Sequence, residues 1–149
     1  MSLEIEIMDH LKNAMRAKDE VALRTLRAIK AAILVEKTAV GAKDTLTKDD
    51  EMKIILKMVK QRKDSITIFE EQNRQDLADK EKEEVEILNQ FLPKQLNSEE
   101  LKSEIVEIIA KVGATSKADL GKVMGQASKL LAGRADGKDI ADTVKSLLP

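Results

Sequence analysis

The side chains best suited to chemistry lie in the last third of the sequence, and they favour binding of an anion. Lys122 and Lys129 are seven residues apart, which places both on one face of a helix. Arg134 and Lys138 flank an expected helix N-terminus, where free backbone N–H groups attract phosphate. With the neighbouring glycines they form one candidate site, here called the tail site: Gly121, Lys122, Gly125, Lys129, Arg134, Gly137 and Lys138.

The segment Gly133-Arg134-Ala135-Asp136-Gly137-Lys138 has only a superficial likeness to a nucleotide-binding loop. That loop needs four residues between its glycines, a Ser or Thr after the Lys, and a preceding strand. Here three residues intervene, Asp139 follows Lys138, and a helix is expected before the segment. The alternative to phosphate contact is that Gly133 ends one helix, Asp136 caps the next, and the charges are solvated.

Gly121 and Gly125 lie about one turn apart inside an expected helix. Each costs roughly 1 kcal/mol of helix stability relative to Ala, so something must favour them. Two interpretations remain open. The glycines allow close approach of another helix within the bundle, or they allow close approach of a partner's backbone.

A second group of cations follows two helices in the first half of the chain. These residues step by about three, which gathers them into a stripe on each helix. Few aromatic residues lie among them, so base stacking is not the main mode of any nucleic-acid contact. A solvated or salt-bridged face is the alternative. This secondary basic stripe consists of Arg24, Arg27, Lys30, Lys60, Arg62 and Lys63.

The sequence predicts no catalytic residue, metal or cofactor. His10 is the single histidine and there is no cysteine, which argues against a hydrolytic triad and against zinc. Asp49-Asp50-Glu51 is expected in the first turn of a helix, where acids favour the helix dipole. Glu81-Lys82-Glu83-Glu84 is expected to be a solvated helix face, and His10 a solvent-facing residue.

The composition indicates an all-α protein. Hydrophobic residues make up 42% of the 149 residues but aromatic residues only 1%, so the core is aliphatic and helix is favoured over sheet. The acidic N-terminus is unlike a secretory signal peptide, and no apolar run reaches the roughly 18 residues that span a membrane. From these features we predict a cytoplasmic protein.

Periodicity and capping residues predict about four helices and then three short ones. The first four are expected at residues 3–17, 20–38, 48–72 and 75–91, with a turn at 40–44. Pro93 cannot continue a helix and marks a domain boundary. Helices starting at Asn97 or Ser98, at Ser116 and at Asp136 then form a small bundle. The predicted domains are residues 1–92 and 93–149.

Six segments, at Leu23–Ile33, Gln61–Ser65, Arg74–Glu81, Phe91–Leu96, Gly121–Gly125 and Gly133–Lys138, form recognisable motifs. They resemble motifs of the GatB/YqeY family, and the resemblance covers nearly the whole chain. The tail motifs resemble a domain that also ends the B subunit of glutamine-dependent aspartyl/glutamyl-tRNA amidotransferase. The sequence departs from the pattern at Asn73, where Gly is expected, and at Gln126-Ala127-Ser128, where larger apolar residues are common.

This resemblance implies a helical N-terminal domain and a helical tail that helps to hold tRNA, while chemistry takes place in other domains and subunits. The leading hypothesis is therefore a non-catalytic accessory protein that binds tRNA or another structured RNA. The alternative is a protein-interaction adaptor, because residues 70–107 hold 12 acidic and 5 basic side chains and Glu81–Glu86 could dock a basic partner. Least favoured is a part in glutamine-dependent transamidation, a carbon–nitrogen ligase activity that rests on the resemblance alone.

Overall fold

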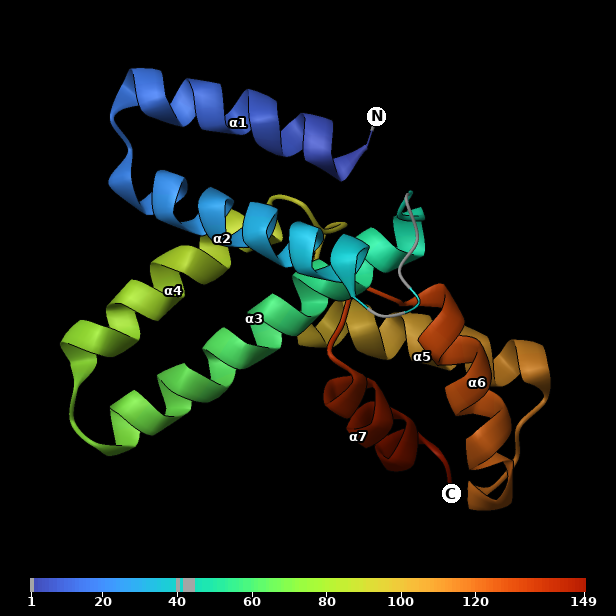
Figure 1. Ribbon diagram of the computed structural model, residues 1–149. Helices are drawn as coiled ribbons and strands as arrows, with labels where there is room; N and C mark the ends of the chain where they lie inside the picture. Colours follow the sequence, from blue (N-terminus) through green and yellow to red (C-terminus); the bar gives the residue numbers. More distant parts are fainter. Residues whose placement is uncertain (1, 40, 42–44) are drawn as a thin grey trace. The chain divides into compact units, whose positions relative to one another are not determined.

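The computed structural model describes residues 2–39, 41 and 45–149, and all regular structure in them is helical (Figure 1). The predicted all-α class is confirmed. The chain forms two compact units, Met1–Leu92 and Pro93–Pro149. The helices are α1 Leu3–Ala17, α2 Glu20–Thr38, α3 Lys48–Glu71, α4 Gln75–Asn89, α5 Ser98–Val112, α6 Leu120–Leu130 and α7 Gly137–Leu147, with a 3₁₀ turn η1 Lys117–Asp119 before α6.

Local capping explains where the helices of the N-terminal unit begin. The Asp19 carboxylate accepts a hydrogen bond from the Ala22 N–H at 3.0 Å and starts α2. Thr47 and Asp50 form a reciprocal capping box at the start of α3. Asn73 separates α3 from α4 with a φ of +58°, a left-handed conformation that Asn tolerates better than most residues. The turn expected at residues 40–44 lies outside the described residues, apart from Gly41.

The core of the N-terminal unit is aliphatic, as the composition indicates. All four helices contribute to it, and a spine of isoleucine and leucine is almost completely buried: Ile7, Ile29, Ile33, Ile55 and Leu88. Each such side chain contributes roughly 1.5–3 kcal/mol by leaving water. Aliphatic burial therefore stabilises the unit without the aromatic residues that many cores contain.

The tail unit packs α5, α6 and α7 around a second, separate core. Its fully buried centre includes Ile105, Val123, Leu131 and Val144. Gly113 ends α5 in a left-handed conformation with a φ of +71°, as expected of a helix C-terminal glycine.

The ends of the other tail helices differ from the prediction. Ser116 caps the 3₁₀ turn, and α6 starts only at Leu120. Gly133, expected to close α6 directly, lies in the following loop with a φ of +77° because α6 ends at Leu130. Elsewhere the differences are one or two residues: α3 ends at Glu71 and α4 at Asn89.

Candidate functional site

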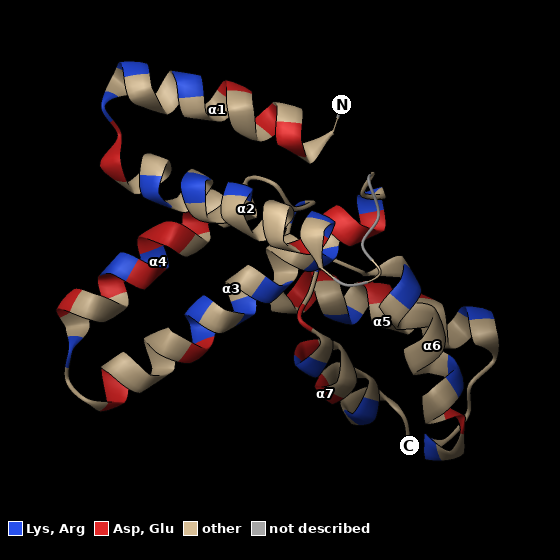
Figure 2. Ribbon diagram, in the orientation of Figure 1, with Lys and Arg blue, Asp and Glu red and all other residues tan. Residues whose placement is uncertain are grey.

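One face of α6 is buried and the opposite face carries the lysines of the tail site. Val123 and Ala127 are completely buried, whereas Lys122 and Lys129 are exposed. No acidic residue occurs between Leu120 and Leu130, and Figure 2 shows α6 with basic segments on it. Neither lysine forms an ion pair within 4 Å in the described part of the tail. This face of α6 therefore presents cations to solvent.

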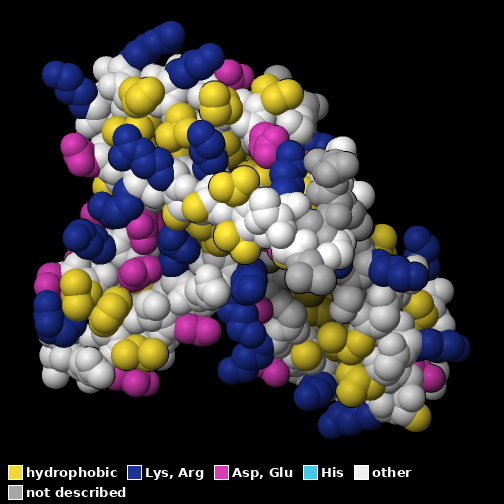
Figure 3. Space-filling model, in the orientation of Figure 1, with side chains coloured by type: hydrophobic (Ala, Val, Ile, Leu, Met, Phe, Trp, Pro, Cys, Tyr) yellow, Lys and Arg dark blue, Asp and Glu magenta, His cyan; other side chains and the backbone are white. Residues whose placement is uncertain are grey.

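The carboxylate of Asp119, just before α6, is stabilised by a main-chain hydrogen bond. The Thr115 N–H donates to its carboxylate at 2.9 Å and holds the pKa of that carboxyl below its usual range. The positive charge of Lys122 contributes a smaller part of this lowering. Lys122 itself is exposed. In the space-filling view, Lys and Arg side chains project from the surface of both units (Figure 3).

Gly121 and Gly125 lie on the same exposed face as the lysines. A Cβ atom built on either glycine, or on Gly137, would meet no other atom within 4 Å. The interpretation that these glycines allow close packing inside the bundle is therefore wrong. Close approach by a partner's backbone stays a prediction.

The backbone of Arg134 is fixed on both sides, while its side chain is not. Its N–H donates to the Leu131 carbonyl at 2.9 Å, and its carbonyl accepts from the Leu96 N–H at 2.8 Å. The guanidinium forms no ion pair or hydrogen bond with the described residues. Arg134 is thus a positioned cation with its donors available.

Lys138 is the second residue of α7 and is exposed. Asp136 precedes the helix in an extended conformation, but its side chain accepts no hydrogen bond from the first turn in the described tail. The first N–H groups of α7 are therefore not occupied by the side-chain cap that the sequence predicted. The tail site thus contains three exposed lysines and Arg134, distributed over α6, the following loop and the start of α7.

The secondary basic stripe does not stay together in the fold. Arg24 Nε donates to Glu84 Oε1 at 2.9 Å, and Arg62 Nε lies 3.3 Å from Glu84 Oε2. The Arg62 Nε is buried and is not aligned for a hydrogen bond, so its contact with Glu84 is an ion pair only. For these two arginines the salt-bridged interpretation holds.

The other members of the stripe remain on the surface. Arg27 and Lys30 on α2, and Lys60 and Lys63 on α3, are exposed and make no ion pair with the described residues. Arg62 differs from the α3 lysines because it lies near the buried side of the helix, where one of its terminal nitrogens donates to the Met58 carbonyl at 3.3 Å.

The prediction that Glu84 lies on a solvated face is wrong. Glu84 is 9% exposed, and the two arginines from α2 and α3 neutralise its charge as burial requires. Glu81, one turn earlier on α4, is half-buried. Burial raises the pKa of the Glu81 carboxyl, the charge of Glu84 adds to the rise, and Arg62 and Arg24 offset part of it.

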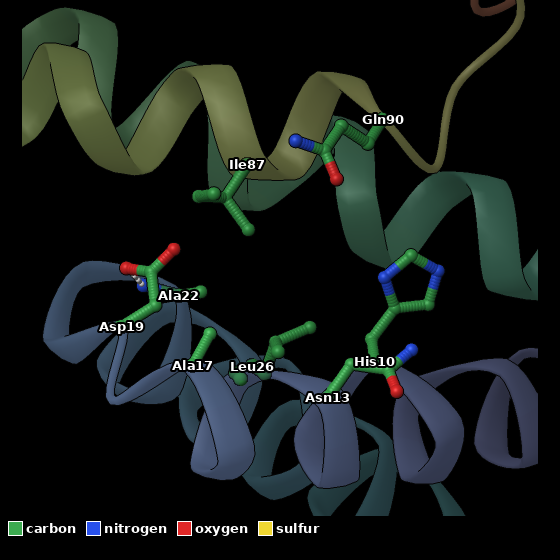
Figure 4. Close-up of a pocket in the computed structure, with 9 residues that line it drawn as sticks. His10, Asn13, Ala17, Asp19, Ala22, Leu26, Ile87 and Gln90 are labelled. Atoms are coloured by element: carbon green, nitrogen blue, oxygen red, sulfur yellow. Dashed lines mark hydrogen bonds between the residues drawn. The ribbon is translucent and has the colours of Figure 1, made fainter.

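His10 is exposed, as predicted, and lines a pocket of about 230 Å³ between α1, α2 and α4 (Figure 4). Its ring packs edge-on against Phe91 with the ring centroids 5.0 Å apart. The other polar lining residues are Asn13, Asp19 and Gln90, and Asp19 already caps α2. The lining contains no Ser, Thr or Lys beside the imidazole, and no signal in the sequence indicates this pocket.

The described residues 2–39, 41 and 45–149 contain neither a metal-binding cluster nor a membrane-spanning helix. No group of three or more His, Cys, Asp or Glu side chains there could hold a metal ion. None of the helices in those ranges is both long enough and apolar enough to cross a membrane.

Comparison with known proteins gives one family and several relatives. The chain matches the family described as Yqey-like protein over residues 4–148. Altered inheritance of mitochondria protein 41, mitochondrial, of Pyrenophora tritici-repentis is 35% identical over 129 residues, covering 84% of this chain and 68% of that protein. The protein of the same name from Clavispora lusitaniae is 30% identical over 142 residues, covering 93% and 81%. An uncharacterized protein of Schizosaccharomyces pombe is 30% identical over 92 residues, covering 62% and 73%.

These relatives correct the predicted location. The names of the first two place them in mitochondria, so the prediction of a cytoplasmic protein is wrong. It depended on an N-terminus unlike a secretory signal peptide and on the lack of a long apolar run, and neither feature separates the two compartments. Leaders for mitochondria are amphipathic and rich in Arg, so a search for an apolar stretch does not find them.

Proposed function

This chain belongs to the YqeY-like protein family, and we propose that it is a non-catalytic accessory protein whose tail site contacts the phosphate backbone of tRNA or another structured RNA. In the same proposal, the four helices of the N-terminal unit precede a three-helix tail of the kind that ends the amidotransferase B subunit. Because the names of two relatives place them in mitochondria, mitochondrial RNAs are included among the candidate ligands.

The exposed face of α6 carries this proposal. It combines two glycines above which the space is open with two exposed lysines that have no ion-pair partner within 4 Å among the residues that the structure describes. A phosphate backbone is bulky and negatively charged, so it needs both the space and the cations. The chain has no Trp or Tyr, so contacts to phosphates and to the shape of the RNA would dominate over contacts to bases.

The test is binding of tRNA to the full-length protein at several salt concentrations. Four phosphate contacts, by Lys122, Lys129, Arg134 and Lys138, give an expected log–log slope of about −3, using roughly −0.7 to −0.9 per contact. The substitutions Lys122→Glu and Lys129→Glu together should weaken binding and reduce the slope by about 1.5.

The matched control changes two exposed lysines of α5, Lys102→Glu and Lys111→Glu, which alters the net charge of the same unit by the same amount. This control should retain most of the affinity and nearly all of the slope. No detectable binding of tRNA by the unmodified protein at low salt would overturn the proposal. Equal losses of affinity in the two double variants would show that only net charge matters. The tail site would then have no part in the proposed binding of RNA.

A protein-interaction adaptor is the alternative, but the acidic segment is less available than its sequence indicates. Glu84 is committed to Arg24 and Arg62, and Lys82 pairs with Glu70 at 3.3 Å. Glu83 and Glu86 are the exposed acids that remain between residues 81 and 86. A part in glutamine-dependent transamidation has no residue of this chain to support it and rests on the family resemblance alone.

A further inference from the structure

The segment that joins the two units is part of the tail unit. Gln95 Nε2 donates to the Gly133 carbonyl at 2.6 Å, and the Leu96 N–H donates to the Arg134 carbonyl at 2.8 Å. Gln95 also donates to the Pro93 carbonyl at 3.0 Å, which shapes the segment itself. Two consecutive residues before α5 thus bind two consecutive carbonyls in the loop after α6.

The loop after α6 contains the buried Leu131 and Ala135, which packs against the tail core, and hydrogen bonds hold the backbone between these two residues. It connects Leu130 to Gly137, and the backbone of Gly133 adopts a left-handed conformation within it. Inside the loop, the Arg134 N–H donates to Leu131. The Gly133 and Arg134 carbonyls, by contrast, are held from outside by Gln95 and Leu96. The direction in which the Arg134 side chain leaves the backbone therefore depends on the joining segment.

We infer that Gln95 is a positioning residue for the tail site, holding Arg134 so that its guanidinium meets a phosphate of the bound RNA. This inference rests on the proposed function. An arginine fork binds phosphate through two parallel hydrogen bonds, so it depends on direction more than a lysine does. A backbone fixed before binding also reduces the entropy that is lost when the ligand is captured.

The experiment is a double-mutant cycle in the full-length protein with tRNA as the probe. The variants are Gln95→Met, which keeps the length of the side chain but removes its donor, Arg134→Gln, and the two combined. Gln95→Met should weaken binding roughly 3- to 10-fold. This is less than the full loss of a charge-assisted hydrogen bond, because the contact of Arg134 with phosphate would be weakened and not removed. In the presence of Arg134→Gln it should have almost no further effect, because the group that it positions is gone.

The salt dependence gives a readout that simple loss of folded protein would not change. Gln95→Met and Arg134→Gln should each reduce the slope by up to one phosphate contact, or about 0.7–0.9. Gln90→Met, at an exposed position directly after α4, is the matched control and should leave affinity and slope unchanged. Without RNA, amide hydrogen exchange at Leu96 should become faster in Gln95→Met than in the control.

The outcomes separate this inference from the proposed function. If the unmodified protein binds no tRNA, the proposed function fails. If it binds, but Gln95→Met has no effect or the same effect with and without Arg134, the positioning role is overturned while RNA binding stands. Normal affinity of Arg134→Gln would also overturn it, because Arg134 would then contact no phosphate.

Discussion

At the scale of single residues, the most consequential feature is a carboxylate shared by two arginines. Glu84 on α4 lies between Arg24 on α2 and Arg62 on α3, and the side chain of Arg62 is only 15% exposed. A charge in such a place stabilises the fold only while its partners remain. Basic residues that look equivalent in the sequence therefore differ: Arg24 and Arg62 pair with Glu84, whereas Arg27 and Lys30 make no ion pair with the described residues.

Replacing Glu84 by Gln should destabilise the protein, because it leaves Arg62 buried without a counter-charge. We expect a loss of about 3 kcal/mol in the free energy of unfolding, at the lower end of the range for broken buried pairs because Arg24 reaches solvent. Urea unfolding measures it. Glu83→Gln, an exposed neighbour on α4, is the control and should change stability by less than about 0.5 kcal/mol. Equal effects of the two substitutions would contradict the structural role of Glu84.

Glu81 should make stability depend on pH. Its folded pKa is raised by burial and by Glu84, so the favourable contribution of the protonated form is present below the unfolded pKa and is lost as the pH rises through the folded pKa. Glu81→Gln should therefore gain stability relative to the unmodified protein as the pH rises from about 4 to 7. Unfolding midpoints across this range, with Glu86→Gln on the same helix as the control, measure the difference. A gain that grows as the pH falls would contradict it.

At the scale of helices, the local sequence predicts where helices begin better than it predicts which residues from different helices come into contact. Asp19, Thr47 and Asn97 each cap the helix that their sequence context indicates, because a cap involves residues only three apart. The burial of Glu84 could not be predicted, because Arg24 is sixty residues away and meets it only after three helices have packed. The tail site is a prediction from charge and glycine spacing, whereas the hydrogen bond from Gln95 to Gly133 could not be predicted, since Gly133 lies 38 residues further on.

The glycines of α6 give a prediction in which stability and binding change in opposite directions. Gly125→Ala should stabilise the tail by about 0.5–1 kcal/mol, because Ala favours helix and the space around a new Cβ is open. The same methyl group should weaken binding of tRNA if the RNA backbone approaches the helix closely. Thermal unfolding and binding titrations measure the two effects. Ser128→Ala, exposed on α6, is the control that raises helix propensity without affecting the glycines. Unchanged affinity in Gly125→Ala would remove the glycines from the site.

At the scale of the whole molecule, each unit has its own aliphatic core, and the chain passes between them at Leu92 and Pro93. The tail is small enough to be marginally stable alone, since domains of about 60 residues bury a limited share of their surface. Even a few hydrogen bonds from the joining segment would therefore supply a large part of the free energy of unfolding of the tail unit.

Two fragments should separate these contributions. Residues 93–149 should fold cooperatively, whereas residues 97–149 should be less stable by about 1–3 kcal/mol, because two hydrogen bonds from Gln95 and Leu96 are lost. Circular dichroism during thermal unfolding compares the two. A fragment 93–149 with no cooperative transition would show that the tail needs the N-terminal unit to fold. Equal transitions would show that the joining segment adds nothing to it.

The shared carboxylate also constrains how this protein can change over generations. One acid serves two bases, so exchanging the charges of Glu84 and Arg24 would bring two positive charges together at Arg62 and could not restore the arrangement. A lineage that loses the acid would have to neutralise or replace both arginines in the same period. The three positions, widely separated along the chain, should therefore be inherited as one unit.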